Sequence, residues 1–255
     1  KSFKELETVL KNIQENMPRV LEASHNANKN MFVRIWGTNA NAKGKASKHL
    51  FGREVYASET ANKLAGSLGN VDLKKNPELE RYFHTIGTAQ CAKELAVKYD
   101  LDCEKAYLTG LLHDCAKCFS NEKLLDIIHQ NLDVEECEML NYKTLHAPVS
   151  AYIAEKEFNV KDKEILSAIR WHTLGKLEMS DFDKIIFLAD KIEPNTRDKE
   201  YSDKIRSILE ENNGLNKALL KCYKETIKSL VKRDLKICLL TIEIYNKLED
   251  LVNVN

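Results

Sequence analysis

Residues 110–117 read GLLHDCAK, and this stretch places a histidine directly before an aspartate near the end of a helical pattern. His113 and Asp114 are neighbours in the chain, so they cannot share one face of a helix that continues through them. Both side chains can point into one pocket if the helix ends here, since the small residues Gly110 and Ala116 leave space. Imidazole and carboxylate together suit iron, manganese and zinc. The stretch therefore predicts a metal site at a helix end.

The same two residue types recur in four other short motifs. They are His84 in RYFHT (81–85), His146 in LHAP (145–148), His172 in WHTLG (171–175) and Asp190 in IIFLAD (185–190). Each histidine taken alone is typical of a structural residue. Taken together with the adjacent pair, the ordered set indicates one metal centre.

The composition favours helices and a charge-balanced surface. Only 9 glycines and 4 prolines occur among 255 residues, in a chain rich in lysine, glutamate and leucine. The 39 basic side chains balance 39 acidic ones. A general nucleic-acid coat needs a basic surface, so nucleic acid is not expected as a partner. A small polyanion held by a few local cations is compatible with this balance.

The same sequence argues against a membrane partner and a disulfide framework. No stretch approaches the roughly 18 consecutive apolar residues of a span, and the first thirty residues lack an apolar signal region. Seven scattered cysteines suit a reducing compartment, so we expect a cytoplasmic protein. For the C-x-x-C of Cys115 and Cys118 we favour two thiols packed near a helix end over a redox or zinc role, because no second pair accompanies it.

The pattern divides the chain into an N-terminal extension, residues 1–75, and a helical domain, residues 76–255. In the extension we expect helices within 2–16 and 56–68. Between them, residues 24–48 carry five lysine or arginine side chains and no acid. A linker or surface loop with one strand is favoured there, and a contact for an anionic ligand or RNA is the alternative.

The spacing of apolar residues predicts that residues 76–255 are all-α. It predicts helices over 78–99, 104–116, 121–130, 148–158, 161–172, 181–191, 201–212 and 215–249. The last range is expected to break near Arg233-Asp234 and to pack within the domain. A homodimer contact through this range is the alternative.

The motifs resemble those of a known family. The order His84, His113-Asp114, Asp190 is the signature of HD-domain phosphohydrolases, and His146 and His172 match their two-metal subset. The strings LERYFHTIG, GLLHDCAK, LHAP, IRWHTLG and LADKIEP resemble one branch, the YqeK-type symmetrical dinucleoside tetraphosphatases. The resemblance covers roughly residues 78–250.

This resemblance implies an all-α HD-domain helical bundle with two divalent metal ions, iron being expected and manganese or another divalent ion the alternative. One ion would be held by His84, His113, Asp114 and Asp190. Asp114 would bridge to a second ion held by His146 and His172. The implied substrate is diadenosine tetraphosphate, cut in the middle to two ADP.

Physical reasoning supplies a mechanism and further candidate residues. A hydroxide held by the ions would attack a phosphorus atom, with Asp114 and Lys117 as the catalytic residues. Nearby cations would position the phosphates, because the leaving group is already a weak base. The candidate substrate-binding residues are Arg81, Lys117, Thr173, Gly175 and Arg197.

Two other functions stay open at this point. The same site could act on nucleoside di- or triphosphates, nucleotide monophosphates or alarmones. Alternatively, the domain could be a nucleotide-sensing adaptor whose first 75 residues bind a partner.

Overall fold

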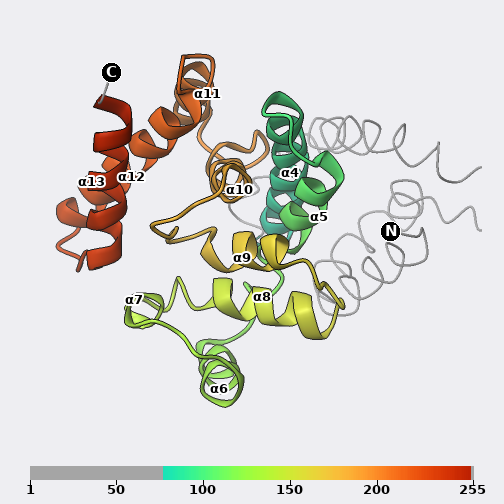
Figure 1. Cartoon of the computed structure of the whole chain (residues 1–255). Helices are drawn as coiled ribbons and strands as arrows, with labels where there is room; N and C mark the ends of the chain where they lie inside the picture. Colours follow the sequence, from blue (N-terminus) through green and yellow to red (C-terminus); the bar gives the residue numbers. More distant parts are fainter. Residues whose placement is uncertain (1–76, 254–255) are drawn as a thin grey trace, which may run out of the picture. The chain divides into compact units, whose positions relative to one another are not determined.

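The computed structural model describes residues 77–253, and these form helices joined by turns and loops, without a strand (Figure 1). The all-α prediction is confirmed for this part of the chain. The expectations for the N-terminal extension, and its boundary at residue 75, lie outside the described residues. The helices are α4 (Pro77–Lys98), α5 (Cys103–Leu112), α6 (Asn121–Asn131), α7 (Glu136–Met139), α8 (His146–Lys156), α9 (Lys163–Trp171), α10 (Asp181–Ile192), α11 (Lys199–Ile208), α12 (Gly214–Lys232) and α13 (Leu239–Asn253).

The helix α10 forms the centre of the core. Nine of its twelve residues are buried, so it is covered on nearly all sides rather than on one stripe. It packs against α5, α9, α11 and α12 (Figure 1). Ser180 caps its first turn, and its last turn carries Asp190. The packing of α10 thus fixes the position of one candidate metal ligand.

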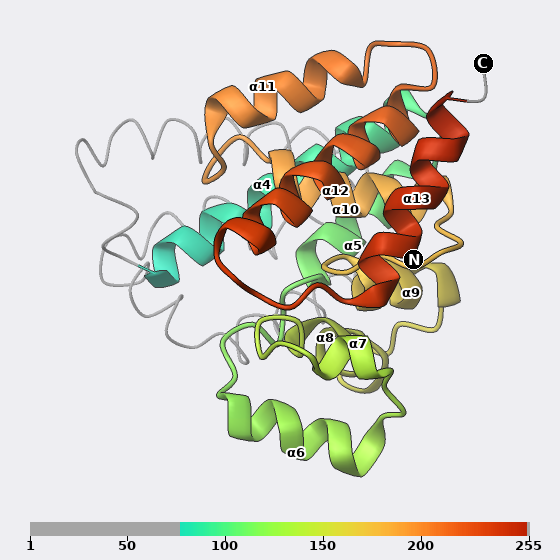
Figure 2. The same ribbon diagram turned by 90° about the vertical axis from the view of Figure 1, so that its left-hand side faces the viewer.

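The C-terminal range is two helices rather than one. α12 and α13 lie side by side (Figure 2), and the break falls at residues 233–238, where Asp234 has a positive φ of 52°. Leu219 and Tyr223 of α12 and Ile244 of α13 are buried in the main core. The predicted break is confirmed. The predicted packing within the domain holds for Leu219 and Tyr223, whereas Leu235 and Leu239 are 42% and 71% exposed.

Two helix boundaries near the candidate site differ from the prediction. α5 ends at Leu112, four residues before the predicted end, and residues 113–118 form turns. α8 begins at His146 rather than at residue 148. The short helix α7 was not predicted at all. A small second core of α6 and α8 side chains, including Leu124, Ile128 and Val149, supports this region.

Among the described residues, no helix is long and apolar enough to cross a membrane.

Candidate metal centre

His113 is held by the end of its own helix. It is the C-cap of α5, fully buried, and its Nδ1 lies 2.6 Å from the carbonyl oxygen of Gly110. A carbonyl oxygen only accepts, so Nδ1 carries the proton. Nε2 then faces Asp114 Oδ2 at 3.5 Å and Asp190 Oδ1 at 3.7 Å. An imidazole nitrogen beside two carboxylates is a set of potential metal donors.

His172 repeats this arrangement at the end of α9. It is the C-cap, and its Nδ1 donates to the carbonyl oxygen of Ile169 at 2.7 Å. Burial lowers the pKa of His172 to about 4, so the ring is neutral near pH 7. Its Nε2 lone pair lies 3.3 Å from Asp114 Oδ1 and 3.3 Å from His146 Nε2. The ring is thus oriented by a backbone carbonyl, as is usual for metal-ligating histidines.

His146 and Asp114 complete this half of the centre. His146 begins α8, is buried, and places Nε2 2.9 Å from Asp114 Oδ1. Burial would raise the pKa of Asp114, but His113 and the contacts with His146 and His172 outweigh it and hold that pKa well below its ordinary value. Asp114 is therefore a carboxylate at neutral pH, with imidazole nitrogens on both of its oxygens.

Asp190 defines the other half. Potential ligand atoms of His84, His113 and Asp190 all lie within 4.8 Å of one another, and all three residues are buried. The two oxygens of Asp190 also accept from cations, Oδ1 from Arg197 Nη2 at 2.7 Å and Oδ2 from Lys191 Nζ at 2.7 Å. Arg197 Nε donates to the Asp190 carbonyl at 2.6 Å, which fixes the end of α10.

Together these residues can hold a divalent metal ion. A second group, formed by His113, Asp114 and His172, shares His113 with the group at Asp190. Neutral nitrogens and carboxylate oxygens are the donors that iron, manganese and zinc accept. Because lone pairs face one another across the centre, a cation would relieve their repulsion. The structure thus brings all six predicted ligands to the two ends of one buried cluster.

Two of the candidate substrate-binding residues lie at this cluster. The side chain of Lys117 is 41% exposed, and its Nζ is 3.0 Å from His146 Nε2 and 3.4 Å from Asp114 Oδ1. Arg197, 38% exposed, is the partner of Asp190. Lys191, which also pairs with Asp190, was not predicted; its position directly after Asp190 in the chain was the available signal.

The other candidates have different surroundings. Arg81 is half-buried on α4, three residues before His84. Thr173 Oγ1 is buried and has no hydrogen-bond partner among the described residues. The Gly175 N–H donates to the carbonyl oxygen of Trp171 at 2.7 Å, so this donor is already engaged. Gly175 also has a φ of 76° and contacts Tyr223, which points to a role in shaping the turn.

The Cys115 and Cys118 thiols are both free. Burial raises the pKa of Cys115 to about 12, so this thiol is protonated and unreactive at neutral pH. The preferred interpretation of the C-x-x-C as two packed thiols holds for Cys115 and is wrong for Cys118, which is exposed.

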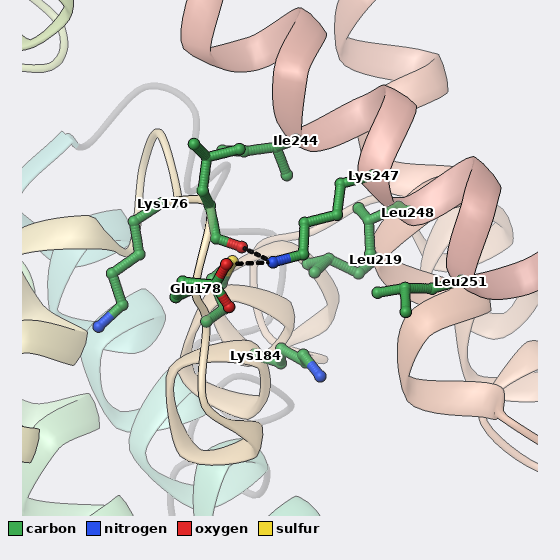
Figure 3. A pocket seen from close by; sticks show the side chains of 10 residues that line it. Lys176, Glu178, Lys184, Leu219, Ile244, Lys247, Leu248 and Leu251 are labelled. Carbon is green, nitrogen blue, oxygen red and sulfur yellow. Dashed lines mark hydrogen bonds and ion pairs between the residues drawn. The ribbon is translucent and has the colours of Figure 1, made fainter.

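A cavity of about 300 Å³ lies apart from the ligand set, between the loop at 176–179 and helices α10, α12 and α13 (Figure 3). Its three lysines all pair with acids of the chain. Lys247 Nζ lies 2.5 Å from Glu178 Oε1, and Lys184 Nζ lies 2.9 Å from Asp181 Oδ1. Lys176 pairs with Asp183 at 2.8 Å. None of the six predicted metal ligands lines this cavity, and most of its other lining side chains are apolar.

Comparison with known proteins agrees with this geometry. Residues 81–195 match the family model of the HD domain. The chain is 38% identical over 168 residues to the "Bis(5'-nucleosyl)-tetraphosphatase, symmetrical" of Halalkalibacterium halodurans. The matched region covers 66% of this chain and 88% of that relative. It is 37% identical to the protein of the same name from Bacillus subtilis, over 65% of this chain and 88% of that one.

A solved structure gives the same picture. The crystal structure of a protein from Clostridium acetobutylicum, described as a predicted HD superfamily hydrolase involved in NAD metabolism, matches with a TM-score of 0.63 and 33% identity. The match covers 76% of this chain and 97% of that protein. With the HD motif, the buried ligand cluster and these relatives in agreement, the chain belongs to the HD-domain hydrolases and, among them, to the family of symmetrical bis(5'-nucleosyl)-tetraphosphatases.

Proposed function

We propose that this protein hydrolyses diadenosine tetraphosphate symmetrically, adding one water across the central P–O–P bridge to give two ADP. The observation that carries the proposal is the cluster around Asp114, where three imidazole nitrogens lie within 3.5 Å of one carboxylate whose side chain is 10% exposed. The names of the most similar curated relatives support the choice of substrate.

The cluster supports a centre of two divalent ions. His84, His113, Asp114 and Asp190 would hold one ion, and Asp114, His146 and His172 the other. Iron is the expected metal, with manganese or another divalent ion as the alternative. When bound, such ions lower the pKa of a water toward neutrality and neutralise charge on phosphoryl oxygens.

The chain's own residues provide orientation for this chemistry. The carbonyl oxygens of Gly110 and Ile169 fix the protonated nitrogens of His113 and His172, so both Nε2 atoms stay aimed at the centre. Burial of the ligands keeps bulk water away and strengthens the electrostatic interactions inside.

Cations at the edge of the centre suit a polyphosphate. Lys117 is the most exposed of them, and its Nζ already lies beside His146 and Asp114, so it can reach a phosphate held there. Arg197 and Lys191 add positive charge at Asp190. Arg81 and the buried Thr173 hydroxyl are further candidates. Gly175 would act through the turn that follows His172.

The proposal is tested by incubating the purified full chain with diadenosine tetraphosphate and Fe²⁺ or Mn²⁺, and resolving the products by chromatography. ADP as the sole product is expected. ATP with AMP would overturn the symmetrical reaction, and turnover confined to mononucleotides or alarmones would favour the alternative substrates. A cytoplasmic location and a homodimer remain predictions.

A further inference from the structure

A buried ion pair joins the short helix α7 to the end of α9. Arg170 donates from Nε to Glu138 Oε1 at 2.9 Å and from Nη2 to Glu138 Oε2 at 2.6 Å. Glu138 is 1% exposed, whereas Arg170 is half-buried. We propose that this pair is a positioning device that sets the spacing of His146 and His172, an inference that rests on the metal centre proposed above.

On the Glu138 side, the connection leads directly to His146. The Thr144 hydroxyl lies 2.9 Å from the carbonyl oxygen of Glu138 and 2.6 Å from that of Asn141, the two acceptors for its one proton. The Ala147 N–H donates to the carbonyl oxygen of Thr144 at 3.2 Å. Thr144 and Ala147 lie on either side of His146 in the turn that begins α8. The position of the His146 imidazole therefore depends on the position of α7, through the contacts of Thr144 with Glu138 and Ala147.

On the Arg170 side, the connection leads to His172. Arg170 lies between Ile169, whose carbonyl oxygen fixes His172 Nδ1, and the end of α9. Its Nη2 also donates to the carbonyl oxygen of Asp133 at 2.9 Å, in the segment that leads into α7. The guanidinium thus holds the last turn of α9 against α7 and against the segment that leads into it.

Helix α7 depends on this pair for its place. It has four residues, too few for a helix that is stable alone. Its capping box uses the same Glu138 carboxylate, which accepts from the Glu135 N–H at 2.9 Å. A planar fork on a carboxylate fixes direction as well as distance, which a lysine or an apolar pair would not do. The consequence is the 3.3 Å separation of His146 Nε2 and His172 Nε2.

The test compares metal binding by the full chain in three variants. Arg170→Lys keeps the charge and loses the fork. Glu138→Gln combined with Arg170→Met removes both charges, so no uncompensated buried charge is left to unfold the protein. Glu225→Gln is the matched control, because it removes the acid of a partly exposed pair with Lys221 on α12, away from the ligand cluster. After chelator treatment, each protein is titrated with Mn²⁺, and anomalous scattering gives the occupancy of each site.

We expect the wild type to bind two ions. In Arg170→Lys and in the double variant, affinity at the His146 and His172 half should fall about 10–100-fold, with the other half changed by less than about threefold. Glu225→Gln should match the wild type. A folded Arg170→Lys or double variant that binds both ions with wild-type affinity would overturn the inference. Absence of bound metal in the wild type itself would instead overturn the proposed function.

Discussion

Replacement of Gly175 by alanine tests whether the turn after His172 is set by packing. With φ at 76°, an alanine here is strained by about 1–3 kcal/mol. Its Cβ would also lie closer than 3.0 Å to Tyr223 Oη, in a site where Tyr223 is 2% exposed and cannot turn away. Displacing that hydroxyl breaks its 2.6 Å hydrogen bond to the Leu174 carbonyl, a further cost of about 1–3 kcal/mol. Gly175→Ala should therefore lower the free energy of unfolding by about 2–6 kcal/mol.

Urea unfolding followed by circular dichroism measures this loss, and Tyr223→Phe provides the control. Tyr223→Phe alone removes the hydrogen bond. In the double variant, Gly175→Ala with Tyr223→Phe, it also removes the closest clash. The next neighbours of the alanine Cβ are then Met179 Sδ at 3.2 Å and Cζ of residue 223 at 3.3 Å. The free energy of unfolding lost in the double variant should thus be about 1–3 kcal/mol smaller than the sum of the losses in the two single variants. Additive losses, or a neutral Gly175→Ala, would refute the packing explanation and return Gly175 to a ligand-binding role.

Three other substitutions separate metal binding, substrate positioning and stability. Asp114→Asn should abolish metal binding, measured by elemental analysis, and reduce kcat/KM at least about 1,000-fold; full activity would contradict the bridging role. Lys117→Ala should reduce kcat/KM about 10–100-fold with unchanged metal content, since one charge-assisted hydrogen bond is lost; loss of metal would show that its role is different. Asp102→Ala removes the acceptor for two N–H groups of α5 and should cost about 1 kcal/mol in urea unfolding, whereas the exposed Asp126→Ala should stay within about 0.5 kcal/mol.

The fold was predictable where local periodicity decides it. The apolar spacing of α10 and its end near Asp190 could be read directly, as could the interruption between α12 and α13. The exact end of α5 was not predicted, because Ala116 and Lys117 are good helix formers and extend the helical pattern beyond Leu112. The helix ends there because the His113 ring turns back onto the Gly110 carbonyl and Asp114 faces the cluster. Helix α7 escaped prediction because its main support, Arg170, lies 32 residues away.

In the candidate site, too, the ligands could be predicted from local sequence and their partners could not. Residue types and their order indicated the ligands, since only a few side chains bind transition metals. The partners of those ligands depend on tertiary placement. Arg197 was expected to bind substrate, but in the structure it reaches back seven residues to both the side chain and the carbonyl of Asp190. Spacing along the chain does not reveal this, because it depends on the turn after α10, where the Glu193 carboxylate accepts from the N–H groups of Asn195 and Thr196.

A chain of zero net charge can bind a polyanionic substrate because a few cations lie next to the metal centre, so an excess of basic residues over the whole surface is not needed. Lys117, Lys191 and Arg197 all lie at the two carboxylates of the centre and are all partly exposed. At short range in a partly buried site, three such charges are screened far less than a diffuse basic surface would be. Neutralising one of them should therefore weaken substrate binding in low and high salt alike, whereas changing an exposed lysine elsewhere should leave it unaffected. Measurement of KM for Lys191→Met at two ionic strengths, beside Lys199→Met on the exposed surface of α11, decides between placed cations and overall charge.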